Sequence, residues 1–330
     1  MNIKNPHNAY MINEENKTLI RQKFDDFDHL LEVLLKWNLN FKQLDRGNFS
    51  GELFFVDHGG LQVSLSSFNR KFDQEGSSPS GYRTFAILAS VDQQIIWRGK
   101  QVSGKNLLVF PETNELDALS YPGFRVYTIA ISNEKVKEFL NVQNLNEQKV
   151  FQSNEGIVTP GKRVINDIRH QLEYLTWIVN ENPKGINSSA FHQIFTKEIP
   201  SMILNSVITE KSIVQPSTLG FRKQRLHKAL EYLKSCEDEM PTVQELCLIT
   251  ETCQRTIEYA FKEKYGFGPK EYMKKLSLNH VRNALKSADP DTATIKHLAG
   301  GFGFWHMGQF SADYKKLFCE SPSETLREGK

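Results

Sequence analysis

Two segments of the chain, residues 243–269 and 295–322, follow one pattern, and this duplication constrains the fold more than any other feature. At one offset, Val243, Leu246 and Cys247 correspond to Ile295, Leu298 and Ala299. After one extra residue in the second copy, Ile257, Phe261, Tyr265 and Pro269 correspond to Phe310, Tyr314, Phe318 and Pro322. We expect the extra residue in a loop between the two helices of the second copy. A generic helical hairpin would explain either copy alone but not two copies in register.

Each copy is predicted to be a short helix, a tight turn and a longer helix. Val243, Leu246 and Cys247 are spaced i, i+3, i+4, which places them on one helical face. Ile257 and Phe261 are four residues apart and anchor the longer helix to the same core. The residues between them are polar and are expected to point outward: Gln254, Arg255, Glu258, Tyr259 and Lys262. A helix with a polar outer face that is held in this way is the form that enters a DNA major groove.

The second copy carries a resemblance to a known family. It contains Gly303-Phe304-Trp305-His306-Met307-Gly308-Gln309-Phe310, then Asp313-Tyr314, Phe318 and Pro322-Ser323-Glu324-Thr325-Leu326. Over about residues 225–328 the chain resembles the AraC/XylS family of bacterial transcriptional regulators, and within it the subgroup that includes the ethanolamine-utilisation regulator. The chain departs from the family pattern at three positions. Glu251 stands where Gly is usual, Cys253 where a Ser caps the longer helix, and Ser277 where Arg is usual; a thiol caps a helix poorly.

The resemblance implies which side chains meet DNA. The base-facing positions are Arg255, Glu258, Tyr259, Gly308, Gln309 and Ala312. The phosphate-facing positions are Gln254, Lys262, His306, Ser311, Lys315 and Lys316. An Arg side chain can make a bidentate contact to guanine, and a Gln side chain can pair with adenine. Phosphate contacts position a protein on DNA without reading its sequence. Trp305 is either a core residue or adjacent to a phosphate, and we favour the core.

Further helices are expected around the two copies. A helix over 221–235 opens the domain with Leu226, Ala229, Leu230 and Leu233 on one face, and a long helix over about 270–286 joins the copies. A rigid joining helix fixes the separation of the two copies, which must be about 34 Å for successive major grooves.

The chain is long enough for two domains. We expect a sensing and dimerisation domain over 1–210, a polar linker over 211–220 and a DNA-binding domain over 221–330. Residues 221–330 hold 18 Lys and Arg against 15 Asp and Glu, a net charge of +3, and the remainder holds 23 against 24, a net charge of −1. No apolar run approaches about 18 residues, and the first ten residues lack the apolar stretch of a signal peptide. A cytoplasmic location is expected.

The N-terminal domain is predicted to be rich in β-strands, which makes the fold class α+β. Residues 24–40 are expected to form a short amphipathic helix, or a helix that passes into an edge strand. Then β-like runs follow between turns rich in Gly, Pro and Ser: Gly51–Val56, Leu61–Phe68, Arg83–Leu88, Ile95–Trp97, Asn106–Phe110 and Arg125–Ile131. Many short strands of this kind indicate a sandwich or a barrel. The family resemblance implies a cupin-like barrel over about 41–132 that binds an effector, with helices over about 133–210.

An effector pocket is assigned to the aromatic and acidic residues near the strand ends: Phe85, Trp97, Phe110 and Glu112. The alternative is that each belongs to the ordinary core or rim. Metal-dependent cupins need several His residues and a carboxylate, whereas His58 stands alone in a turn-rich stretch and is expected to be solvated. The four cysteines form no CxxC pair. We therefore expect no metal, no cofactor and no catalytic residue, and a redox role for Cys253 is a secondary hypothesis.

One helix carries a short coiled-coil seam. Its apolar residues are spaced 3, 4, 3, 4 along the chain: Ile165, Ile168, Leu172, Leu175 and Val179. The seam predicts either a homodimer contact or a helix that packs on its own domain.

Three functions are weighed. The first is a sequence-specific transcriptional activator that binds double-stranded DNA, responds to an unknown small molecule and, by resemblance, contacts RNA polymerase. The second is a ligand-independent regulator whose N-terminal domain dimerises or binds a protein. The third is a cupin-type enzyme with an appended helical domain, against which the missing metal ligands argue.

Overall fold

The computed structural model describes residues 10–14, 17–34, 36–111, 113, 115–152, 156–209, 220–236 and 240–328. The chain divides into two compact units. Unit 1 consists of Met1–Asn40, Phe49–Asn69 and Gln74–Gln215, and unit 2 of Phe41–Asn48, Arg70–Asp73 and Pro216–Lys330. Two short segments from the N-terminal half therefore belong to the C-terminal unit. The linker expected at 211–220 lies outside the described residues, except for Gly220.

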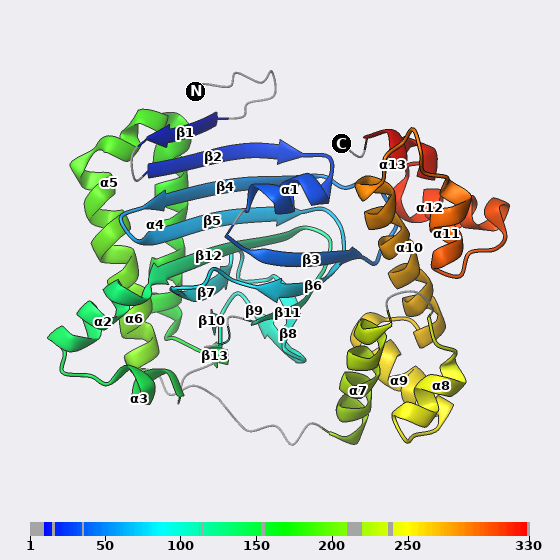
Figure 1. Cartoon of the computed structure of the whole chain (residues 1–330). Helices are drawn as coiled ribbons and strands as arrows, with labels where there is room; N and C mark the ends of the chain where they lie inside the picture. Colours follow the sequence, from blue (N-terminus) through cyan, green and yellow to red (C-terminus); the bar gives the residue numbers. More distant parts are fainter. Residues whose placement is uncertain are drawn as a thin grey trace. The chain divides into compact units, whose positions relative to one another are not determined.

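The β-strands form two sheets (Figure 1). The eight-stranded sheet has the order β1 (Tyr10–Glu14), β2 (Lys17–Phe24), β4 (Gly51–His58), β5 (Leu61–Phe68), β12 (Phe124–Ser132), β7 (Tyr82–Leu88), β10 (Leu107–Val109) and β13 (Gly156–Val158). The five-stranded sheet has the order β3 (Asn38–Gln43), β6 (Phe72–Ser77), β11 (Glu115–Ser120), β8 (Gln94–Trp97) and β9 (Lys100–Ser103). The β4–β5 hairpin turns at Gly59 and Gly60, both with positive φ, as a tight hairpin requires.

The α+β class is confirmed, and every predicted β-run overlaps a strand: β4, β5, β7, β8, β10 and β12. The run Asn106–Phe110 extends one residue beyond β10 at each end. The expected barrel limits, about 41–132, were too narrow. The strands begin at Tyr10, and β13 lies within the region assigned to helices. Because the described strands form two sheets with open strand orders, the closed barrel stays a prediction.

Helices pack on one face of the eight-stranded sheet (Figure 1). These helices are α2 (Asn133–Val142), α3 (Glu147–Gln152), α4 (Lys162–Glu181), η1 (Pro183–Asn187), α5 (Ser189–Gln193), η2 (Ile194–Glu198) and α6 (Ile199–Thr209). The earlier helix α1 (Phe27–Val33) is not part of this group and falls within the predicted 24–40. Alternate strand residues such as Val63, Phe85 and Ile129 point into this core. The period-two pattern of the strands and the apolar stripes of the helices therefore meet in one apolar layer.

The seam on α4 is part of that layer. Its residues are 0–2% exposed and pack in the core of unit 1: Ile165, Ile168, Leu172, Leu175 and Val179. The dimer interpretation of these five residues is therefore wrong, and the alternative of a helix packed on its own domain is confirmed. An amphipathic helix needs an apolar stripe for its own core, and the heptad spacing does not say which surface that stripe meets.

Unit 2 is helical apart from its two N-terminal segments. Its helices are α7 (Phe221–Ser235), α8 (Val243–Ile249), α9 (Gln254–Tyr265), α10 (Pro269–Ser287), α11 (Ile295–Gly301), α12 (Met307–Phe318) and α13 (Pro322–Glu328). These bounds agree closely with the predicted 221–235, about 270–286 and the two duplicated copies. None of the helices in the described part of the chain is long and apolar enough to cross a membrane.

Candidate nucleic-acid interface

Each copy of the repeat begins with a capped helix. At α8, the Thr242 hydroxyl accepts a hydrogen bond from the Glu245 amide (3.2 Å), and the Glu245 carboxylate accepts one from the Thr242 amide (2.7 Å). This reciprocal pair satisfies two of the backbone donors that a helix start leaves free. At α11, the Thr294 hydroxyl accepts from the His297 amide (3.3 Å). The two short helices therefore start at equivalent positions.

The paired apolar residues form the cores of the two copies. In the first copy, Leu246, Ile257, Phe261 and Tyr265 are buried, and in the second copy Ala299, Phe310, Tyr314 and Phe318 are buried. Pro269 and Pro322 are also buried, and each lies in the first turn of the helix that follows its copy. A proline is well tolerated there because no intrahelical donor is needed. The alignment of the two copies therefore describes their packing.

The turns show where the extra residue lies. Glu251 and Gly303 occupy the same place after the short helix, and both have a left-handed backbone, with φ of 51° and 82°. The segment between α8 and α9 is 250–253, and that between α11 and α12 is 302–306. The second turn is longer by one residue, as predicted. The longer helices also end alike, since Gly266 and Cys319 are both left-handed caps.

The longer helices α9 and α12, termed the recognition helices, present the predicted DNA-facing residues to solvent. Exposed are Gln254, Arg255, Tyr259, Lys262, His306, Gly308, Gln309, Ser311, Ala312, Lys315 and Lys316, and Glu258 is half-buried. The opposite faces hold Ile257, Phe261, Phe310 and Tyr314 in the core. Both helices therefore expose one polar face each, which is the arrangement that a groove-reading helix needs.

On α9 the outward side chains contact one another. The Gln254 side-chain amide donates to the Glu258 carboxylate (2.8 Å), and the Arg255 guanidinium donates to the Tyr259 hydroxyl (3.4 Å). The guanidinium also lies over the Tyr259 ring, 5.5 Å from its centroid. Pairs four residues apart face each other on a helix. Tyr259 thus holds the Arg255 side chain on the outer face of the helix.

On α12 the single long polar side chain among the three base-facing positions is Gln309. Its amide donates to Asp313 (3.0 Å), and Asp313 pairs with Lys274 of α10 (3.2 Å). The pKa of Asp313 lies below its ordinary value, because hydrogen bonds from Gln309 and Lys274 and the positive charges of Lys274 and Lys316 outweigh the opposing effect of burial. This chain of contacts joins the outward face of α12 to the joining helix.

Two predictions at the ends of the recognition helices are resolved by the structure. Trp305 is 78% exposed in the turn before α12, so its assignment to the core was wrong. A large exposed aromatic beside a recognition helix is a candidate for contact with DNA, and the glycines around it in the sequence were the signal for a turn.

Cys253 is exposed at the start of α9, and within the described residues its side chain makes no capping hydrogen bond. The thiol instead lies 3.3 Å from the Thr256 hydroxyl, whose hydrogen bond helps to lower the pKa of Cys253.

The effector residues predicted in unit 1 are not one cluster. Phe85 packs against Phe151 in the sheet–helix core. Trp97 and Phe110 contact each other, with ring centroids 4.7 Å apart, and Glu112 lies outside the described residues. Phe85 is therefore a core residue, and Trp97 with Phe110 forms a separate aromatic pair.

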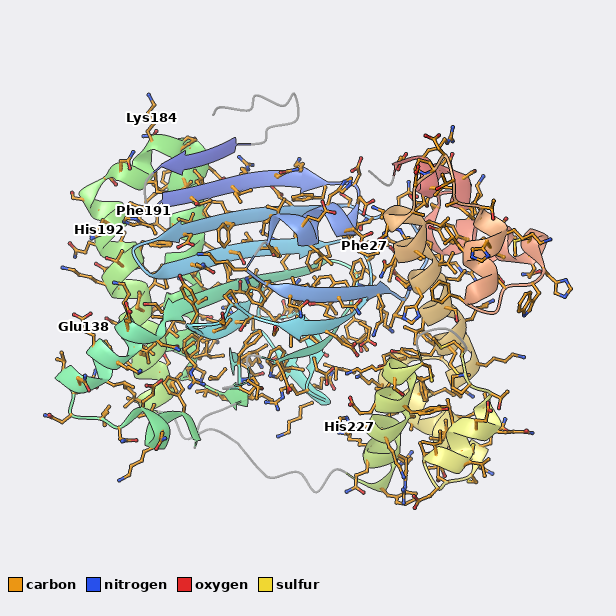
Figure 2. All side chains as sticks on the ribbon, viewed as in Figure 1. Phe27, Glu138, Lys184, Phe191, His192 and His227 are labelled. Carbon is orange, nitrogen blue, oxygen red and sulfur yellow. The ribbon has the colours of Figure 1, made fainter. Side chains whose placement is uncertain are left out.

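His58 was expected to be solvated, and this was wrong. The residue is buried at the end of β4, and its Nε2 lies 3.0 Å from Nδ1 of His192 on α5. His192 is labelled in Figure 2. Residue 192 is far from residue 58 in the sequence, and so the pattern around His58 gave no sign of this partner. Among the described residues there is no group of three or more His, Cys, Asp or Glu side chains placed to hold a metal ion.

The helices of unit 2 match a known protein family. Residues 246–328 match the family described as "Helix-turn-helix domain". The chain is 30% identical over 99 residues to the "Probable thc operon regulatory protein" of Rhodococcus erythropolis, which covers 30% of each chain. It is 22% identical over 178 residues to "XylDLEGF operon transcriptional activator 3" of Pseudomonas putida, which covers 52% of this chain and 53% of the relative. The chain thus spans about half or less of the length of these curated relatives.

A solved structure also matches part of the chain. It is a probable AraC family transcriptional regulator from Rhodopseudomonas palustris CGA009, 30% identical, with a TM-score of 0.30, and the match covers 32% of this chain and 97% of that one. The narrower ethanolamine-utilisation subgroup stays a prediction. The family match falls on the helices that carry both exposed polar faces, and through them the chain belongs to the AraC/XylS family of transcriptional regulators.

Proposed function

We propose that the chain is a sequence-specific transcriptional activator that binds double-stranded DNA with α9 and α12. The observation that carries the proposal is the pair of recognition helices, each with a buried apolar face and an exposed polar face, joined by the single helix α10. RNA polymerase is the further partner that activation requires. The cytoplasm, where bacterial DNA lies, is the compartment that this function requires.

Two variants are expected to distinguish a side chain that reads a base from one that contacts a phosphate. Arg255→Ala should lower affinity for the preferred DNA by about 1–3 kcal/mol and relax the preference at one base position, because a bidentate contact to guanine would be lost. Lys316→Ala should weaken binding to all sequences alike and reduce the slope of log affinity against log salt. Fluorescence anisotropy with preferred and random duplexes at two salt concentrations measures both effects. Equal losses of Arg255→Ala on both duplexes would refute the base-reading role.

A small-molecule effector is proposed for unit 1, near Trp97 and Phe110. Phe110 contacts both Trp97 and Thr84: its ring lies against the Trp97 ring, and its backbone amide donates to the Thr84 carbonyl (3.0 Å). Within the described residues, Trp97 Nε1 and Thr84 Oγ1 are buried and have no hydrogen-bond partner. A buried donor without a partner is costly, and a ligand with hydrogen-bond acceptors would remove that cost.

A thermal-shift screen of the full chain against metabolites tests the effector. A true effector is expected to raise the melting midpoint, and the rise should increase with the ratio of its concentration to its dissociation constant. The variant Trp97→Phe, which keeps an aromatic ring but removes Nε1–H, should reduce that shift. If no compound raises the midpoint, the ligand-independent regulator is the better account of unit 1.

A second copy of the chain is the proposed partner of unit 1, through the outer face of α4. Tyr174 and Trp177 are 48% and 57% exposed and stack on each other, with ring centroids 6.0 Å apart. An antiparallel pair of α4 helices centred near Leu172 would place Arg163 of one copy beside Glu181 of the other. An apolar centre with complementary charges at its ends is what a two-fold interface needs.

A further inference from the structure

The two N-terminal segments of unit 2, Phe41–Asn48 and Arg70–Asp73, are joined to each other, and we call them the clasp. The Leu44 amide donates to the Lys71 carbonyl (2.9 Å), and the Lys71 amide donates to the Asp45 carboxylate (2.7 Å). The Arg70 guanidinium pairs with Asp45 at 3.5 Å. The clasp is therefore one hydrogen-bonded piece, made from the end of β3, the start of β6 and the residues beside them.

One side of the clasp holds the end of the first recognition helix. Lys71 Nζ donates to the carbonyl of Tyr265, the last residue of α9 (2.7 Å). The carboxylate of Asp73, 1% exposed, accepts from the hydroxyls of Tyr272 (2.7 Å) and Tyr265 (3.2 Å). The last carbonyls of a helix lack intrahelical donors and favour a positive charge nearby, and Lys71 supplies both the donor and the charge.

The other side of the clasp holds the end of the second recognition helix in the same way. Gln43 Nε2 donates to the carbonyl of Leu317 (2.9 Å), and the Gly47 amide donates to the same oxygen (3.2 Å). Leu317 is the penultimate residue of α12. In each recognition helix, a carbonyl of the last turn therefore accepts from the clasp.

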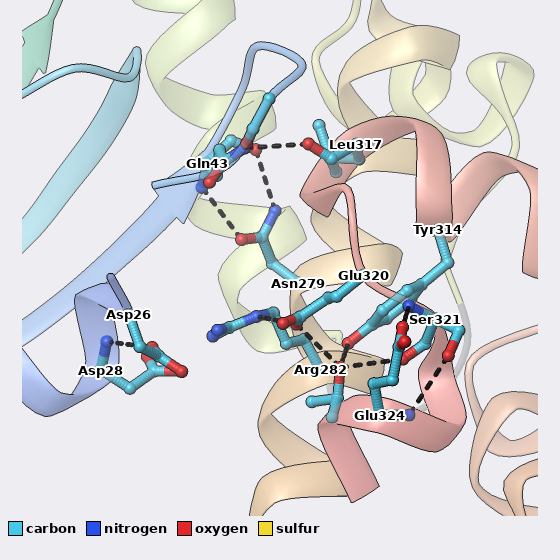
Figure 3. A network of polar contacts seen from close by, with 12 residues as sticks. Asp26, Asp28, Gln43, Asn279, Arg282, Tyr314, Leu317, Glu320, Ser321 and Glu324 are labelled. Carbon is cyan, nitrogen blue, oxygen red and sulfur yellow. Dashed lines mark hydrogen bonds and ion pairs between the residues drawn. The ribbon is translucent and has the colours of Figure 1, made fainter. Parts of the chain in front are cut away.

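Between these two ends the clasp is fixed to the joining helix. The backbone amide of Gln43 donates to Asn279 Oδ1 (2.9 Å), and Asn279 Nδ2 donates to the backbone carbonyl of Gln43 (3.1 Å) (Figure 3). Asn279 is buried in α10, and its side chain pairs with the backbone of Gln43 as a neighbouring strand would. Tyr272, which donates to Asp73, is also on α10. The clasp thus contacts α9, α10 and α12.

We propose that the clasp positions the two recognition helices relative to each other, so that both reach their DNA sites together. This proposal rests on the proposed function. Two linked binding modules gain affinity when their linkage holds them at the separation of their sites, and they lose that gain when the linkage loosens. Loss of the clasp should therefore affect DNA that carries both sites and spare DNA that carries one.

The test uses the full chain and duplexes selected by the wild-type chain from a random library, with versions in which one half of the site is scrambled. Asn279→Ala is expected to lower affinity for the two-site duplex by about tenfold, because two buried hydrogen bonds are lost. Affinity for either one-site duplex should change by less than about twofold. One base pair inserted between the half-sites should penalise Asn279→Ala less than the wild type, because a looser linkage tolerates a changed spacing.

The matched control is Asn283→Ala, an exposed position one turn further along α10, which should bind all duplexes like the wild type. If Asn279→Ala does not fold, Gln43→Ala is judged by the same criteria, since it keeps the backbone pair with Asn279 and removes the bond to Leu317. Equal losses on one-site and two-site duplexes, or no loss on either, would overturn the positioning role. A wild-type chain that selects no sequence would instead overturn the proposed function.

Discussion

At the scale of single residues, Glu251 shows how a local cost is offset. Its backbone is left-handed, with φ of 51°, at a position where the second copy has Gly303. This conformation is unfavourable for residues with a Cβ. The Glu251 carboxylate, however, pairs with Lys228 (2.8 Å) and Arg225 (3.9 Å), both on α7. The departure from Gly that the sequence reveals therefore provides a link between the turn and the first helix of the domain.

The link to Glu251 predicts a pH dependence of stability. The pKa of Glu251 lies below its ordinary value, because Lys228 donates a hydrogen bond to the carboxylate and the charges of Lys228 and Arg225 add to the effect. A carboxyl group with a lowered pKa stabilises the fold above its unfolded-state pKa of about 4.3, and that contribution disappears as the pH falls through the folded-state pKa.

Glu251→Gln should accordingly lower the melting midpoint at pH 7, and the difference from the wild type should vanish as the pH is lowered below about 4. Melting curves of the full chain across this range measure it. Glu231→Gln is the control, since Glu231 pairs with Lys234 of its own helix (3.2 Å). A difference for Glu251→Gln that is the same at every pH would show that the ion pairs are not its cause.

Residue-level predictions succeeded where position along a helix decides exposure. Gln309 and Lys316 are exposed because they lie opposite Phe310 and Tyr314 on a regular helix. They failed where a distant segment decides it: His58 is buried next to His192, and Phe85 packs on Phe151. Hydrophobic period gives the face of a helix or strand, but it does not give the identity of what that face meets.

At the scale of elements, α4 has two faces with different roles. The stripe from Ile165 to Val179 packs inside unit 1, while Tyr174 and Trp177 remain exposed on the other side. Exposed aromatic pairs are unusual on a surface without a partner and are enriched at interfaces. The proposed dimer therefore uses the exposed face of α4 with Tyr174 and Trp177, and not the face that carries the heptad residues.

The dimer prediction is tested by sedimentation of the full chain over a range of concentrations. Trp177→Glu is expected to raise the dissociation constant by at least about tenfold, because an anchor aromatic is lost and a charge is buried in its place. The unfolding midpoint of the monomer should change little, since Trp177 is exposed. Val142→Glu, at an exposed position on α2, is the matched control. A monomer at all concentrations in the wild type would contradict the proposal.

Helices were predicted more accurately than strands for a physical reason. The long helices show several turns of period and clear limits, such as Thr242 before α8 and Gly266 after α9. The missed strands are short or contain charged residues: β1, β2, β6, β9, β11 and β13. The edge-strand alternative for 24–40 agrees with the start of β3. In β2, for example, Lys17, Arg21 and Lys23 leave too few apolar residues for a strand pattern to be distinct. Such strands are recognised by their neighbours in the sheet rather than by their own residues.

At the scale of the whole molecule, the least predictable feature was which chain segments make up unit 2. A boundary at 211–220 follows from composition, but the clasp depends on contacts such as Tyr265 with Asp73, which are 192 residues apart in the sequence. A local pattern cannot contain such a pair, because each partner reads as an ordinary residue in its own segment. The duplicated units were predictable because the apolar residues that form the core of each copy lie close together in the sequence.

The interleaved origin of unit 2 bears on how such regulators can be recombined. A hybrid made by grafting residues 216–330 onto a foreign sensor would omit Gln43, Lys71 and Asp73. The tyrosine hydroxyls at 265 and 272 would then lack their carboxylate acceptor, and Asn279 would lack the peptide that it pairs with. A hybrid that is to keep the native separation of α9 and α12 would therefore need the donor segments Phe41–Asn48 and Arg70–Asp73 in addition to residues 216–330.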